Sequence, residues 1–170
     1  MKRKIAILGA GMMGSALAFP AAENGNEVRI IGTCLDDEII DGYIKTRKHE
    51  KFCRAFPENV SFHYFKDWKN QVQDCDFVIG GVSSFGVDWF LDEVLTQLDP
   101  HMPVLSVTKG LRATEDGTLL SYPGFWKASW QNVASIVPFV PLAAPAPATS
   151  SSSWIRLKWR SAAATMMHCA

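Results

Sequence analysis

The fold of this chain is decided by residues 4–14, whose sequence is KIAILGAGMMG. Lys4 to Leu8 is a short apolar run with β-branched residues, and it predicts a buried parallel strand. Three glycines spaced G-x-G-x-x-G follow at once, and a helical stretch runs from Met12 to about Asn24. A strand that enters a glycine turn and leaves it as a helix is the context in which this motif is informative.

The three glycines would have different tasks in a dinucleotide-binding turn. Gly9 permits the tight bend, Gly11 lets a pyrophosphate approach the bare backbone, and Gly14 lets helix and strand pack closely. The helix start, at Met12 and Met13, offers unpaired N–H groups and a partial positive charge to the phosphates. We therefore predict cofactor binding at these five residues, against the alternative of a plain glycine turn.

Strand and helix signals alternate along the following hundred residues. Further strands are predicted at 27–31, 60–65, 76–82 and 104–108, and further helices at 36–46, 68–72 and 89–98, with a loop at 45–58. This alternation predicts an α/β fold of the Rossmann type, with a doubly wound parallel sheet. Because ligands of such sheets bind at the carboxyl ends of the strands, the turns after Leu8, Val82 and Thr108 should meet there.

The second strand should end in the residue that recognises the cofactor's ribose. NAD enzymes usually place an acid there, but this strand ends in Ile31, Gly32 and Thr33, and Asp36 more plausibly starts a helix. Thr33 could hydrogen-bond a 2′-phosphate, and the side-chain direction of Arg29 is open. The expected cofactor is therefore NAD or NADP, without a choice between them.

Lys109 follows the strand at 104–108 and is held by a turn at Gly110. A lysine in this place faces the ligand crevice and suits a phosphate, alkoxide or carbonyl oxygen. On its own, a solvated surface lysine is the more frequent explanation.

Composition excludes several other classes of function. The chain has 170 residues, 48% of them hydrophobic, and 17 basic against 17 acidic residues. That balance gives no reason to expect nucleic acid or an anionic membrane as a partner. No apolar stretch approaches the roughly 20 residues of a membrane span, and glycines interrupt the signal-peptide-like start.

Cysteines and histidines indicate neither a disulfide framework nor a metal centre. The four cysteines are scattered and form no C-x-x-C pair, and the four histidines show no ligand spacing with them. We expect reduced thiols, a cytoplasmic protein and no metal.

The sequence changes character after Asp116, beyond which it has no acidic residue. Residues 141–153 are rich in Pro, Ala and Ser, and a basic patch lies between Trp154 and Trp159. A disordered tail and a basic aromatic partner surface are two interpretations. We favour a third, translation in a shifted frame, because codons can be chosen for 141–151 that spell AGGPCTSYEL in another frame. Residues 1–128 then form the Rossmann domain, and 129–170 stay unassigned.

Four motifs in order resemble the N-terminal domain of NAD(P)-dependent glycerol-3-phosphate dehydrogenase. They are the glycine turn at 9–14, NGNEVR at 24–29, GVSS at 81–84 and TKGL at 108–111, and residues 32–40 resemble a subgroup of that family. The resemblance extends from Met1 to about Ala128. Ser83 stands where the family commonly has proline, so that loop should differ slightly.

The resemblance implies hydride transfer between a nicotinamide cofactor and the dihydroxyacetone phosphate/glycerol 3-phosphate pair. It gives Lys109 a catalytic role in contacting substrate and cofactor, and it adds Ser83 to the cofactor contacts. A small phosphorylated substrate is implied, and a homodimer of the intact enzyme is allowed. The family continues with a glycine-proline segment, which the shifted-frame peptide resembles, and with a helical substrate domain that supplies a second lysine for proton transfer.

Since that second domain is absent from this sequence, the isolated chain should not turn over. Two alternatives stay open. One is the N-terminal half of another two-domain dehydrogenase, such as a ketopantoate, pyrroline-carboxylate or hydroxyacid enzyme. The other is a non-catalytic dinucleotide-binding module.

Overall fold

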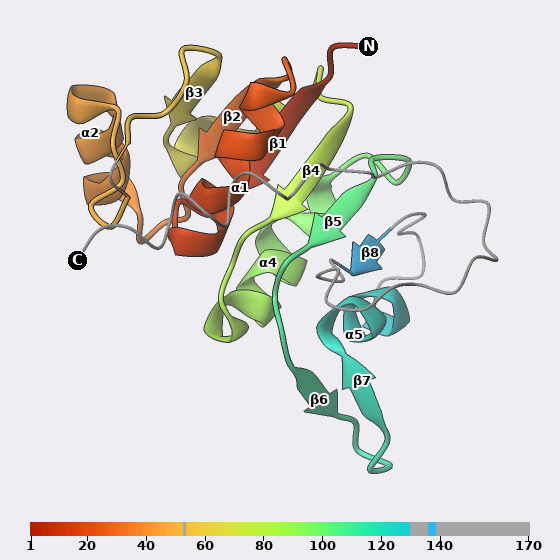
Figure 1. Ribbon diagram of the computed structural model, residues 1–170. Helices are drawn as coiled ribbons and strands as arrows, with labels where there is room; N and C mark the ends of the chain where they lie inside the picture. Colours follow the sequence, from red (N-terminus) through yellow and green to blue (C-terminus); the bar gives the residue numbers. More distant parts are fainter. Residues whose placement is uncertain (53, 130–135, 139–170) are drawn as a thin grey trace, which may run out of the picture.

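The computed structural model describes residues 1–52, 54–129 and 136–138 (Figure 1). The elements in chain order are β1 (Lys4–Leu8), α1 (Met12–Glu23), β2 (Glu27–Ile31), α2 (Asp37–Thr46), β3 (Val60–His63), a 3-10 turn (Phe65–Asp67), α3 (Trp68–Val72), β4 (Phe77–Gly80), a 3-10 turn (Ser84–Gly86), α4 (Val87–Glu93), a 3-10 turn (Leu95–Gln97), β5 (Val104–Ser106), β6 (Leu111–Ala113), β7 (Leu119–Ser121), α5 (Tyr122–Ser129) and β8 (Ile136–Pro138).

Six of these strands form one parallel sheet in the order β3-β2-β1-β4-β5-β8. The chain starts at the centre, moves out through β2 and β3, and then returns past β1 to β4, β5 and β8. This reversal beside β1 is the switch point at which doubly wound sheets bind their ligands. The predicted Rossmann-type fold class is confirmed.

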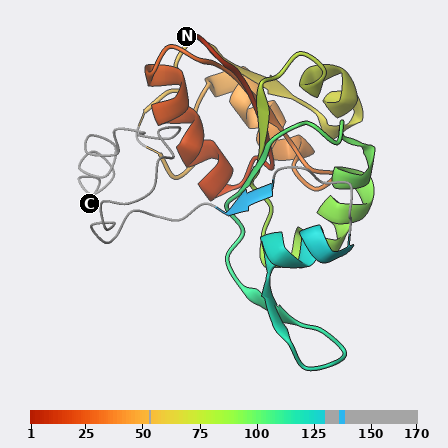
Figure 2. The same cartoon turned by 90° about the vertical axis from the view of Figure 1, so that its right-hand side faces the viewer.

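Helices cover both faces of the sheet (Figures 1 and 2). Successive residues of β1 point to opposite faces, so that Ile5 and Ile7 pack in the cluster that includes α1 and α2. Ala6 and Leu8 pack in the cluster formed with α3, α4 and α5. β1 is therefore covered on both faces, which explains its continuous apolar sequence.

The predicted strands and helices are found with shifted ends. The strand expected at 76–82 pairs only over β4, and the one expected at 104–108 only over β5. The helix expected at 89–98 begins earlier, at Val87, and its regular part ends at Glu93, followed by the 3-10 turn at Leu95–Gln97.

Three features were not predicted from the sequence. The first is the antiparallel hairpin of β6 and β7, which projects away from the sheet (Figure 1). The second is α5, whose Trp126 is fully buried and donates its indole N–H to the carbonyl of Val87 at 3.1 Å. The third is β8, which lies beyond residue 128 and pairs with β5 through the fully buried Ile136. The shifted-frame segment at 141–151 lies outside the described residues.

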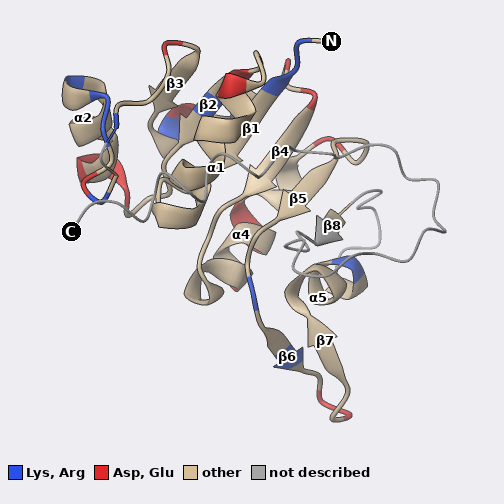
Figure 3. Ribbon diagram, in the orientation of Figure 1, with Lys and Arg blue, Asp and Glu red and all other residues tan. Residues whose placement is uncertain are grey.

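Charged residues of both signs are interspersed along the ribbon (Figure 3). Among the described residues, no helix is long and apolar enough to cross a membrane. In the same part of the chain, no three His, Cys, Asp or Glu side chains come together as metal ligands.

Candidate functional site: the carboxyl edge of the sheet

The glycine turn between β1 and α1 is built so tightly that two of its three glycines cannot carry a side chain. Gly9 has φ +112°, and a Cβ on it would lie 2.8 Å from the carbonyl oxygen of Gly81. A Cβ on Gly14 would lie 2.3 Å from the carbonyl oxygen of Gly9 and 3.2 Å from a methyl group of Ile7. The 2.8 Å and 2.3 Å contacts with backbone are closer than real Cβ atoms show, so these glycines serve the turn and the packing of α1 on β1.

Gly11 differs from both, because a Cβ on it would meet no atom of the described residues within 4 Å. The backbone at Gly11 therefore borders open space, not protein. It is also the N-cap of α1, with φ −65° and ψ 174°. The N–H groups of Met12 and Met13 are at the first helical positions, which have no acceptor inside the helix. Bare backbone beside unpaired helix N–H groups fits a pyrophosphate.

Ala10, between the first two glycines, is held from both sides. Its N–H donates to Oδ2 of Asp36 at 3.1 Å. Its carbonyl oxygen lies 2.9 Å from the Ser15 hydroxyl and 2.8 Å from the Tyr43 hydroxyl. Ser15 is fully buried and Tyr43 is 2% exposed. Burial raises the pKa of Tyr43 to about 12, so its hydroxyl keeps the proton that it donates.

The predicted ribose contact, Thr33, follows the carboxyl end of β2. Its N–H and its hydroxyl both donate to Oδ2 of Asp36, at 2.8 and 2.9 Å. Both donors of Thr33 are thus already used within the protein. Its hydroxyl oxygen accepts from the Leu35 N–H at 3.3 Å, which leaves one lone pair for a further donor. The same carboxylate oxygen of Asp36 joins Thr33 to Ala10, and so the turn after β2 to the turn after β1.

The turn after β5 carries Lys109. The hydroxyl of Thr108 donates to the carbonyl of Val82 at 2.8 Å, which ties this turn to the turn after β4. Gly110 has φ +137°, and a Cβ on it would lie 2.5 Å from the ring of Tyr122. Lys109 is exposed between these two fixed points, and Ser83 is exposed in the neighbouring turn after β4.

The predicted site residues therefore follow four adjacent strands of the sheet. Thr33 comes after β2, the glycine turn after β1, Ser83 after β4 and Lys109 after β5, and these strands are neighbours in the order β2-β1-β4-β5. All four turns lie at carboxyl ends, because every strand in the sheet is parallel.

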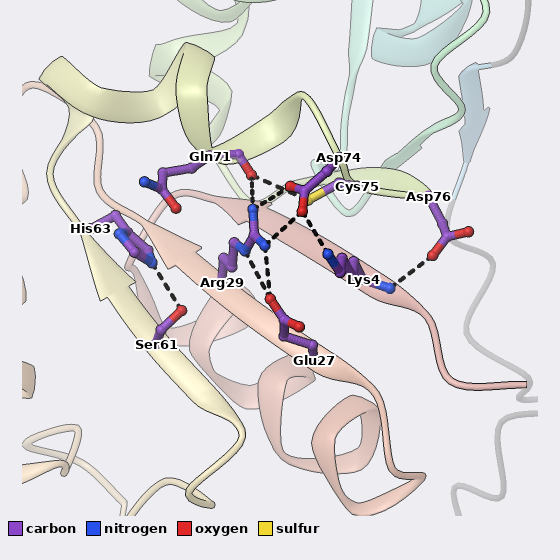
Figure 4. A network of polar contacts seen from close by, with 9 residues as sticks. All are labelled: Lys4, Glu27, Arg29, Ser61, His63, Gln71, Asp74, Cys75 and Asp76. Atoms are coloured by element: carbon purple, nitrogen blue, oxygen red, sulfur yellow. Dashed lines mark hydrogen bonds and ion pairs between the residues drawn. The ribbon is translucent and has the colours of Figure 1, made fainter.

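Arg29, whose direction the sequence left open, lies in a polar network on the sheet (Figure 4). Its guanidinium contacts both carboxylate oxygens of Asp74, at 2.5 and 3.1 Å, and pairs with Glu27 at 2.8 Å. Lys4 pairs with the same Asp74 at 2.6 Å. Arg29 and Lys4 hold the pKa of the Asp74 carboxyl well below its usual range. This arginine is therefore committed to joining β2 to the segment before β4.

Sequence reasoning missed Asp36, Ser15 and Tyr43 as parts of the site. Asp36 does stand at the start of α2, as expected, but its carboxylate turns back to the glycine turn instead of capping its own helix. Its distance from the motif was a usable signal, because ribose-binding acids stand about 20 residues beyond the glycines. Ser15 and Tyr43 gave no local signal, since their contact depends on how α1 and α2 pack.

A parallel sheet with a tight glycine turn at its switch point defines a dinucleotide-binding domain of the Rossmann type. The chain matches the family model of the NAD-dependent glycerol-3-phosphate dehydrogenase N-terminus over residues 4–123, and it belongs to that family. The resemblance drawn from the four sequence motifs is thereby confirmed.

Individual relatives agree with this assignment. The chain is 35% identical over 127 residues to the NADP(+)-dependent glycerol-3-phosphate dehydrogenase of Archaeoglobus fulgidus, a match covering 72% of this chain and 36% of that enzyme. It is 29% identical over 113 residues to the NAD(P)+ glycerol-3-phosphate dehydrogenase of Francisella philomiragia, covering 65% of this chain and 33% of that enzyme. The chain thus spans about a third of the length of these relatives.

Solved structures show the same fold. The glycerol-3-phosphate dehydrogenase of Coxiella burnetii superposes with a TM-score of 0.62 at 21% identity, over 79% of this chain and 39% of that one. A 2-dehydropantoate 2-reductase from Enterococcus faecalis gives a TM-score of 0.54 at 22% identity, over 75% of this chain and 37% of that one. At these identities the likeness speaks for the fold alone.

Proposed function

We propose that this chain is the cofactor-binding part of a glycerol-3-phosphate dehydrogenase and binds NAD or NADP across the glycine turn. The observation that carries the proposal is the contrast among the three glycines. Gly9 and Gly14 are closed in by protein, whereas Gly11 borders open space beside the free N–H groups of α1. A dinucleotide's pyrophosphate needs this arrangement, and the family to which the chain belongs is named for NAD-dependent chemistry.

In this proposal the nicotinamide cofactor supplies the hydride chemistry between dihydroxyacetone phosphate and glycerol 3-phosphate. The chain's own residues bind and orient the cofactor and the substrate. The pyrophosphate is held by the glycine turn, at Gly9, Gly11, Met12, Met13 and Gly14. The Thr33 hydroxyl oxygen accepts a hydrogen bond from the ribose, and Ser83 borders the other half of the cofactor. Lys109 is the catalytic candidate, because an exposed ammonium on a fixed turn at the strand ends can hold a substrate oxygen beside the nicotinamide.

The isolated chain should bind the dinucleotide without turning it over, because positioning the substrate and moving its hydroxyl proton require groups from the part that only the longer relatives span. A chimera tests this. Residues 1–123, which include the family match at 4–123, replace the corresponding part of the Archaeoglobus enzyme.

The chimera should reduce dihydroxyacetone phosphate but not ketopantoate. Lys109→Met should lower its kcat/KM at least about hundredfold, a loss typical for removing one stabilising charge. Lys45→Met, an exposed lysine on α2, is the control. Reduction by the 170-residue chain alone, or no effect of Lys109→Met in an active chimera, would contradict the proposed roles.

Three finer expectations belong to the same proposal. The full-length enzyme would act in the cytoplasm, form a homodimer and use a small phosphorylated substrate in place of nucleic acid. Sedimentation of the active chimera measures the dimer directly.

The boundary at residue 128 stays a proposal, to be set against the pairing of β8 at 136–138 with β5 in the same sheet. The shifted frame farther along the chain is also a proposal. Resequencing the gene from codon 125 onward, with translation in all three frames, checks the shifted frame. A second frame that spells a glycine-proline segment followed by a long helical domain supports it, whereas early stop codons in the other frames contradict it.

A further inference from the structure

The peptide group between Ala10 and Gly11 has one fixed side, and this determines where its other side points. The Ala10 carbonyl oxygen faces the hydroxyls of Ser15 and Tyr43, which lie 2.8 Å from each other in the buried layer between α1 and α2. A trans peptide group directs its N–H opposite to its carbonyl. The N–H of Gly11 therefore points away from this buried layer, and the Cα of the same residue borders open space on the side where a Cβ would stand.

Either hydroxyl of the Ser15–Tyr43 pair is sufficient to donate a hydrogen bond to the Ala10 carbonyl. Ser15 and Tyr43 have two hydrogens for three mutual contacts, so at most two contacts are hydrogen bonds at any moment. Every arrangement that uses both hydrogens gives the Ala10 carbonyl at least one bond. Removing one hydroxyl leaves the other to donate, and only the removal of both frees the carbonyl.

The preceding peptide group is fixed by a separate contact. Oδ2 of Asp36 accepts from the Ala10 N–H, while the same oxygen accepts twice from Thr33. Ala10 itself is fully buried. Both peptide groups that flank Ala10 are thus held by side chains from outside the motif, and neither can rotate without breaking a bond in a partly or fully buried place.

We propose that Asp36 and the Ser15–Tyr43 pair are positioning residues for the dinucleotide site: by holding Ala10 from both sides they direct the Gly11 N–H toward the pyrophosphate. This inference rests on the dinucleotide binding proposed above. It also gives Asp36 a task other than selecting the ribose. Its effect on affinity is then the same for NADH and NADPH, whereas an acid that contacts the 2′ position affects the two cofactors differently.

The test is a double-mutant cycle on the 170-residue chain, with dissociation constants for NADH and NADPH from calorimetry. Ser15→Ala and Tyr43→Phe each weaken binding by less than about threefold, and the double variant weakens it by about tenfold or more, for both cofactors alike. Tyr64→Phe is the matched control, because Tyr64 donates to Asp41 on the exposed side of α2.

Asp36 is tested in the same assay. Asp36→Ala weakens NADH and NADPH binding by the same factor, about tenfold, and Asp36→Asn restores most of it, because an amide oxygen can still accept from the Ala10 N–H. Asp37→Ala, which removes the neighbouring exposed charge at the start of α2, is the control. An unchanged double variant, or an Asp36→Ala that alters only the ratio of the two affinities, overturns the positioning role.

A ligand-free measurement separates this inference from the proposed function. Amide hydrogen exchange at Ala10, whose N–H donates to Asp36, speeds up in the Ser15→Ala/Tyr43→Phe variant and in Asp36→Ala by more than at the core amides of β1, but not in Tyr64→Phe or Asp37→Ala. Unchanged exchange overturns the inference even if the wild-type chain binds NADH. If exchange changes as expected but the wild-type chain binds neither cofactor, the proposed function is what fails.

Discussion

The hydroxyl of Thr108 donates a hydrogen bond of 2.8 Å to the backbone carbonyl of Val82. This bond joins the turn after β5, which carries Lys109, to the turn after β4. It is a contact between segments 26 residues apart, made at the edge of the sheet where the cofactor is proposed to bind.

Thr108→Val keeps the shape of the side chain but leaves the Val82 carbonyl without this donor. The free energy of unfolding should fall by about 1 kcal/mol, the usual net value of one intramolecular hydrogen bond. Urea titration measures the change. Thr96→Val is a suitable control, since that exposed hydroxyl bonds only to the Asp92 carbonyl of the preceding turn. An equal loss of unfolding free energy in the two variants would show that the bond between the two turns stabilises the fold no more than an exposed hydrogen bond within one turn.

Gly14→Ala and Gly11→Ala should separate the packing of the turn from its contact with the ligand. A methyl group on Gly14 meets backbone at 2.3 Å, which costs about 3 kcal/mol of stability, at the upper end for overpacking. A methyl group on Gly11 meets no atom of the described residues within 4 Å, so stability should change by less than about 0.5 kcal/mol. Circular dichroism during urea unfolding measures both. A Gly11→Ala variant as unstable as Gly14→Ala would contradict the open space at Gly11.

Arg29→Met tests the polar network at the centre of Figure 4. The Arg29 side chain is 13% exposed and binds two carboxylates and the Gln71 carbonyl, so its loss should cost about 2 kcal/mol, below a fully buried pair because Asp74 is half exposed. Arg54→Met removes an exposed pair with Glu23 and a cation–π contact with the Phe19 ring at 4.2 Å, and should cost about 1 kcal/mol. If both variants lose the same stability, the network is no stronger than a surface pair.

The free energy of unfolding should fall in two separate steps as the pH is lowered. Burial lowers the pKa of His49 and of His63 from 6.5, so protons bind the unfolded chain more readily, and stability present above pH 6.5 is lost as the pH falls below it. The pKa of Asp74 and of Asp76 is also lowered, so their contribution is present above pH 3.8 and is lost below it.

The first step can be assigned to a residue. The Nδ1 atom of His49 accepts from the Lys51 N–H at 3.0 Å, an acceptor that protonation removes. His49→Gln should therefore flatten the fall in unfolding free energy between pH 7 and pH 5, while His101→Gln, on the exposed surface, should leave it. A slope that His49→Gln does not change would assign the step to other groups.

Much of the sheet was predictable because its signals are local. The apolar run of β1 and the three glycines are adjacent in sequence, and each glycine's task follows from its position in the motif. The hairpin of β6 and β7 was missed because its strands have only three residues each and little alternation. α5 was missed although Pro123 near its start and Tyr122, Phe125 and Trp126 at positions i, i+3 and i+4 were usable signals, because eight residues contain too few repeats to establish a helical period.

The site was predictable where it is made of backbone turns and not where it is made of contacts between elements. Lys109 and Ser83 follow strands directly, so sequence order places them at the sheet's edge. The contacts that fix Ala10 come from residues 5, 26 and 33 positions away, through side chains whose directions depend on how α2 packs. No local pattern encodes such distances.

Calorimetric titration of NADH and NADPH into the wild-type chain and into Gly11→Val tests the central claim most directly. The account predicts saturable binding of at least one cofactor at one site per chain. It also predicts at least tenfold weaker binding by Gly11→Val, with unchanged thermal unfolding, because the valine fills the space left for the pyrophosphate. Equal affinity of the two proteins, or no binding of either cofactor by a folded wild-type chain, would contradict it.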